Sequence, residues 1–101
     1  MPKVSMAVDE VSLKELFKIS FKYENKIKNK KIVLEIRPLT LGDYIEIFDE
    51  DGNANVWDVL QRCIISPKLD SEILKTIPIG IAMDIFKVIM NESFLPQTEQ
   101  S

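Results

Sequence analysis

The chain has 101 residues, of which 46% are hydrophobic and 29% charged, and this balance predicts one globular domain, 1–95, with a flexible tail at 96–101. Histidine is absent, which excludes imidazole acid–base catalysis and most zinc sites, while the net charge of −3 does not favour nucleic-acid binding. The lone cysteine excludes an intrachain disulfide, so we expect a cytoplasmic protein. With no histidine and no catalytic motif, we expect that it is not an enzyme and uses no metal or cofactor.

The first third of the chain predicts a short helix and then a β-hairpin at about 17–37. Ser12 and Glu15 have the spacing of a capping box at the start of that helix. Hydrophobic residues then alternate with polar ones in two runs, Phe17, Ile19, Phe21 and Tyr23 in the first and Ile32, Leu34 and Ile36 in the second. The lysine-rich tract between the runs, 24–31, is expected to be a solvated turn, because it lacks the arginine and interleaved aromatic residues of a phosphate-binding surface.

The segment after the hairpin contains residues that end a strand and begin a helix. Pro38 cannot donate to a β-ladder, and Thr40 can cap a helix that carries Asp43 in its first turn. The helix is predicted at about 41–49. One face of it holds four hydrophobic side chains that we expect to pack on the hairpin: Leu41, Tyr44, Ile45 and Phe48.

An acidic turn at 49–53 follows, and its alternating Asp and Asn residues suggest a calcium loop. The EF-hand pattern fails, however, because Ala54 and Leu60 stand where glycine and glutamate are required. We therefore expect an ordinary acidic turn.

Three more helices are predicted, at about 55–65, 70–76 and 78–92. Asn55 and Asp70 are placed as N-caps, and Pro67 ends the first of these helices. Cys63 has apolar neighbours and is expected to be a small buried side chain. The predicted fold is α+β, with the N-terminal hairpin packed on a C-terminal bundle of three to four helices.

The last helix is apolar over nearly its whole circumference, although it is too short and too charged to span a membrane. Ala82, Ile85 and Ile89 form the centre of its apolar side. One interpretation is a central helix that its neighbours surround on three sides. The other is a binding face for a partner or for a second copy, since methionine and phenylalanine adapt to different apolar partners. On this second interpretation the candidate partner-binding residues are Ile79, Met83, Phe86, Met90 and Phe94.

Three stretches resemble the small tail assembly chaperones of tailed bacteriophages: "IRPLTLGDY" at 36–44, "WDVLQRCIISPKL" at 57–69 and "TIPIGIAMDIFKVI" at 76–89. Together with their surroundings they cover about two thirds of the chain. The resemblance implies binding to the tape-measure protein and to tail-tube subunits before assembly, in the host cytoplasm, which prevents premature aggregation. We assign Arg37 to polar contacts at the end of the hairpin, and Tyr44 to the core.

Other classes of function remain open. A structural subunit or a helical interaction module of a larger phage-like particle would use the same apolar helix for permanent contacts. Nucleic-acid binding through the lysine tract fits the acidic net charge poorly. An enzyme that uses Asp43, Glu46 or the acidic residues at 49–51 lacks any sign of a cleft.

Overall fold

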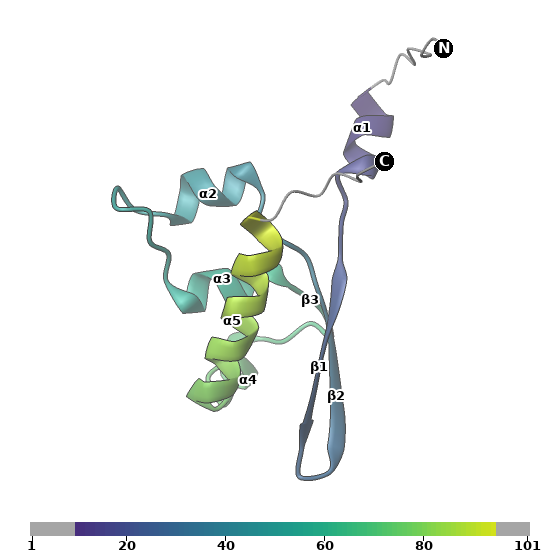
Figure 1. Ribbon diagram of the computed structural model, residues 1–101, viewed down its shortest axis with the longest axis vertical. Coiled ribbons are helices and arrows are strands. Elements are labelled where there is room, and N and C mark those ends of the chain that lie inside the picture. The colour runs from purple at the N-terminus through teal and green to yellow at the C-terminus, as the bar shows by residue number, and fades with distance from the viewer. Residues whose placement is uncertain (1–9, 95–101) are drawn as a thin grey trace.

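A computed structural model of the protein describes residues 10–94, and the predicted tail lies outside this range (Figure 1). The elements in chain order are α1 (Glu10–Leu16), β1 (Phe21–Ile27), β2 (Lys30–Ile36), α2 (Leu41–Ile47), α3 (Val56–Cys63), β3 (Ile64–Ser66), α4 (Ser71–Leu74) and α5 (Ile79–Phe94). The α+β class is confirmed: a three-stranded antiparallel sheet, in the order β1-β2-β3, is combined with helices.

A tight two-residue turn closes the hairpin. The register of β1 and β2 ends at the pair Ile27 and Lys30, and the two residues between them, Lys28 and Asn29, both have positive φ angles, 52° and 66°. This is the left-handed geometry of a type I′ turn, which matches the twist of the strands. The lysines of this tract are exposed as predicted, but the turn is only two residues long, because the rest of the tract continues the two strands.

The hairpin begins later than predicted. Phe17 and Ile19 are exposed and precede β1, because β2 ends at Ile36, the ladder partner of Phe21, and Pro38 cannot extend the ladder. The helix before it, α1, stands beyond the end of the hairpin (Figure 1), and Ser12 lies inside this helix rather than at its N-cap.

A third strand replaces the end of a predicted helix. The helix expected at 55–65 ends at Cys63, and Ile64–Ser66 forms β3, which pairs with the end of β2. The backbone N–H of Arg37 donates to the Cys63 carbonyl at 2.9 Å, which holds the corner between α3 and β3 against the hairpin. Two β-branched isoleucines at this position favour a strand. The helical spacing of apolar residues continues to Ile64, so the sequence pattern does not show where the helix ends.

The core lies between the hairpin, α3 and α5. Its buried hydrophobic residues are Tyr23, Leu34, Ile36, Val59, Leu60, Cys63, Ala82, Ile85 and Ile89. The predicted centre of the apolar side of α5 is therefore confirmed as buried. The Tyr23 hydroxyl donates to Asp84 Oδ2 at 2.7 Å, which links β1 to α5 beside this core.

The predicted place of α2 is wrong. Its hydrophobic face does not lie on the hairpin, because Leu41 is 75% exposed and Ile45 is 71% exposed. Tyr44, assigned to the core, is 45% exposed and stacks on Phe48 with ring centroids 4.6 Å apart. In Figure 1, α2 lies beside the C-terminal end of α5, away from the hairpin, and the arrangement of helices is thus only partly as predicted.

Cys63 is expected to resist modification by thiol reagents in the folded protein. Its side chain is fully buried, and burial raises the pKa of the thiol to about 11, so little thiolate forms at pH 8. With a disulfide reagent at that pH we expect slow, unfolding-limited modification and immediate reaction in denaturant. A fast reaction without denaturant would contradict the burial of this corner.

Candidate partner-binding surface

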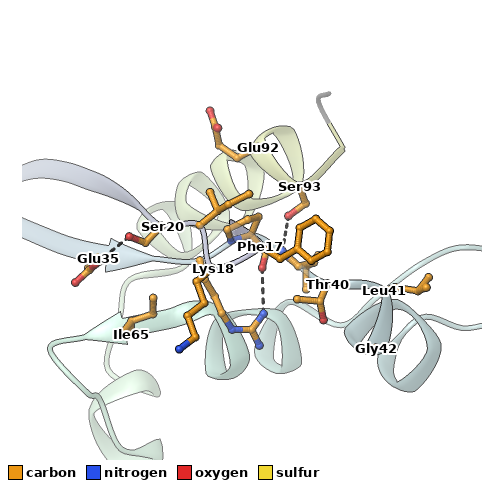
Figure 2. Close-up of a pocket in the computed structure, with 14 residues that line it drawn as sticks. Phe17, Lys18, Ser20, Glu35, Thr40, Leu41, Gly42, Ile65, Glu92 and Ser93 are labelled. Carbon is orange, nitrogen blue, oxygen red and sulfur yellow. Dashed lines mark hydrogen bonds between the residues drawn. The ribbon is translucent and has the colours of Figure 1, made fainter. Parts of the chain in front are cut away.

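Exposed apolar side chains gather where three segments meet: the linker from α1 to β1, the junction from β2 to α2, and the C-terminal end of α5. A groove of about 840 Å³ lies between these segments (Figure 2). A smaller hollow of about 270 Å³ adjoins it, and the junction residues Leu39, Thr40 and Leu41 border both. We call the apolar side chains of this region, with Ile45 one turn further along α2, the groove surface: Phe17, Ile19, Leu39, Leu41, Tyr44, Ile45, Ile65 and Phe94.

A network of charged groups holds α2 in place. Thr40 Oγ1 accepts from the N–H of Asp43 at 3.2 Å, and Asp43 Oδ2 accepts from the N–H of Thr40 at 2.8 Å, which completes a capping box. Arg37 donates to both carboxylate oxygens of Asp43, at 2.7 and 3.3 Å. Arg62, from α3, donates to Oδ1 at 3.0 Å and also pairs with Glu46 at 2.8 Å. The predicted cap and the polar role of Arg37 are therefore confirmed.

Asp43 remains charged although it is buried. Burial alone would raise the pKa of this carboxyl, but the hydrogen bonds from Arg37, from the Thr40 backbone and from Arg62 outweigh it and hold the pKa well below its usual range. Asp43 is also the only buried residue of α2. Because charge-assisted hydrogen bonds orient the helix instead of apolar packing, its hydrophobic face is left open.

A serine fastens the junction to α5. The backbone N–H of Leu39 donates to Ser93 Oγ at 2.8 Å, and the Ser93 hydroxyl donates to the Ile89 carbonyl at 2.6 Å. Figure 2 shows this bond at the groove, where Ser93 and Thr40 line the same side. The junction that borders both hollows is therefore held at two points: Ser93 binds Leu39 at its start, and Arg37 binds Asp43 just after it.

The candidate residues on α5 are dispersed. Ile79 is 77% exposed and Met83 is also exposed, but both lie in the first half of α5, whereas Phe86 and Met90 are partly buried. Phe94 is 59% exposed, borders the smaller hollow and meets Phe48 edge-on at 6.2 Å.

Of the five candidates, only Phe94 therefore belongs to the groove surface. Ile79 lies fifteen residues away on the same helix, or about 22 Å along its axis. Leu41 and Ile45 were recognised in the sequence as part of an apolar face but were assigned to the core, and Phe17 was assigned to a strand.

The polar groups of the groove serve structural contacts. Ser20 donates to Glu35 at 2.9 Å, and Lys18 pairs with Glu15 at 3.2 Å. Within residues 10–94 no group of three or more acidic, cysteine or histidine side chains is placed to hold a metal ion, and none of the helices is long and apolar enough to cross a membrane. What the groove surface offers a partner is therefore mainly apolar area.

No family model, curated protein or solved structure matches this chain. The resemblance to tail assembly chaperones thus rests on the sequence motifs alone. The first of them, at 36–44, forms the end of β2, the junction and the start of α2, and it therefore lies in the wall of the groove.

Proposed function

We propose that the protein is a phage tail assembly chaperone that holds an apolar helical segment of a tape-measure or tail-tube protein in the groove. The observation that carries this proposal is the open groove surface, in which Phe17, Leu41 and Ile45 are each more than two thirds exposed. Monomeric proteins rarely leave a contiguous patch of this kind without a partner. Complete burial of one such side chain contributes about 1.5–3 kcal/mol, so a few of them suit reversible holding.

The place of the resembling motif supports the same proposal. The stretch at 36–44 supplies the junction, and the junction borders both hollows. A holding chaperone in the host cytoplasm needs adaptable apolar surface and no catalytic group. In the residues described, the charged side chains nearest the groove are engaged in ion pairs and caps, and none forms an acid–base pair with a free nucleophile.

Substitution of aspartate for Leu41 or Ile45 is expected to weaken partner binding without unfolding the protein. Either change places a charge on the part of the groove surface that α2 provides, yet both side chains are exposed, so stability should change by less than about 0.5 kcal/mol. The measurement is co-expression with a tape-measure fragment, followed by size exclusion with light scattering. The unmodified protein should keep the fragment soluble, and either variant should weaken the complex at least about tenfold, since each lost apolar contact costs about 1.5 kcal/mol or more.

Ile79→Asp and Met83→Asp are the matched controls, because they place the same charge on exposed apolar positions of α5 outside the groove. We expect both to bind as the unmodified protein does. Loss of binding in these controls alone would move the site to the first half of α5. A fragment that aggregates regardless of the protein would overturn the proposed function, and a complex that never dissociates would favour a structural subunit instead.

A further inference from the structure

Acidic residues flank the part of the groove surface that α2 provides. Residues 38–61 include six Asp or Glu and no Lys or Arg. Arg37 and Arg62 neutralise Asp43 and Glu46. The three acidic residues that follow α2, Asp49, Glu50 and Asp51, are all exposed.

This acidic turn is fixed in position beside the groove surface. Asp49 Oδ1 accepts from the backbone N–H groups of Asp51 and Asn53, each at 2.9 Å, and Gly52 provides the positive φ of 80° that closes the turn. The turn begins directly after Phe48, whose ring contacts both Tyr44 and Phe94. The acidic turn therefore follows the C-terminal end of α2, where the helix terminus adds negative potential.

The residues around α2 carry a net charge of the same sign. Residues 38–94 contain four Lys or Arg and ten Asp or Glu, a net charge of −6, while the hairpin holds five lysines. An approaching segment therefore meets negative potential around α2 and gains from positive charge of its own.

We infer that the segment held in the groove is an amphipathic helix with lysine or arginine at one end of its apolar stripe. With that stripe on Leu41 and Ile45, the basic residues would lie against the acidic turn, about 10 Å or two helical turns further along. This inference rests on the proposed function and adds the charge and the orientation of the bound segment. Apolar burial supplies the affinity, and the carboxylates of Glu50 and Asp51 select the partner.

Two labelled peptides test the inference by fluorescence anisotropy. Both carry the same stripe of leucine and isoleucine at helical spacing, and two turns beyond it one has two lysines and the other two glutamates. At low salt, about 0.05 M, the lysine peptide should bind about 5- to 10-fold more tightly, and at about 0.5 M most of this preference should disappear because surface charges are then screened.

The double variant Glu50→Lys and Asp51→Lys should remove or reverse the preference. Glu72→Lys is the control, because Glu72 is an exposed acid on α4, at the opposite end of α5 from α2 (Figure 1). This control should retain the preference.

The outcomes separate the inference from the function on which it depends. Equal binding of both peptides would overturn the inference and leave the proposed function standing, whereas binding of neither would overturn the function as well. A preference that survives in the double variant would show that the acidic turn makes no contact. A stable dimer of the protein alone that excludes both peptides would identify a second copy as the occupant and also contradict the inference.

Discussion

Replacement of Ile89 by alanine is expected to lower the free energy of unfolding by about 4 kcal/mol. Ile89 is completely buried at the centre of the inner side of α5, between the hairpin and α3. Removal of three carbon atoms loses their transfer free energy and leaves a cavity that α5, packed on two sides, can only partly close. Urea denaturation followed by far-UV circular dichroism measures the change.

Ile79→Ala is the matched control on the same helix. Ile79 is 77% exposed, so its loss should change the free energy of unfolding by less than about 0.5 kcal/mol, and the helix preference of alanine should offset part of that. Similar losses at the two positions would contradict the assignment of the inner side of α5.

Asp43→Ala is expected to cost about 3 kcal/mol, close to the effect of a core substitution. The change removes the capping box of α2 and leaves Arg37 and Arg62, which both point at Asp43, without their shared partner. The loss should appear in urea denaturation, and peptide binding should weaken with it, because the position of α2 depends on this carboxylate.

Asp70→Ala is the control that separates the contribution of the two arginine contacts from that of helix capping alone. Asp70 caps α4 through one hydrogen bond, to the Ile73 N–H at 2.9 Å, so its loss should cost only about 1 kcal/mol. If Asp43→Ala cost no more than this control, the two arginines would contribute nothing beyond an ordinary cap.

The contribution of Asp43 has a defined pH dependence. The pKa of its carboxyl in the folded protein is held well below the value in the unfolded chain, near 4. Its stabilising effect should therefore be complete above about pH 5 and be lost as the pH falls through the strongly acidic range. In acid, the stabilities of the unmodified protein and of Asp43→Ala should converge.

Local signals in the sequence were reliable where the neighbouring residues decide the structure. Thr40, Asn55 and Asp70 cap their helices as predicted, because each side chain reaches a backbone N–H two or three residues ahead. The lysine-rich turn and the buried centre of α5 were also recognised from short-range patterns.

The parts that depend on distant contacts were missed. Hydrophobic periodicity identified an apolar face on α2 but does not say what covers this face. The position of α2 is set by the pairing of Asp43 with Arg62, nineteen residues away. In the same way β3 depends on the pairing of Glu35 with Ser66. The groove surface combines side chains from several of these segments, so among its members only Phe94 was predicted from the sequence as a partner-binding residue.

The most direct test of the groove as the binding site is a methyl NMR titration of the isoleucine- and leucine-labelled protein with a tape-measure fragment. We predict shifts for Ile19, Leu41 and Ile45 of the groove surface and an unchanged signal for Ile79. This control is as exposed as Leu41 and Ile45 but lies about 22 Å away from Phe94 along α5. Shifts at Ile79 with no change at Leu41 and Ile45 would contradict the groove as the binding site.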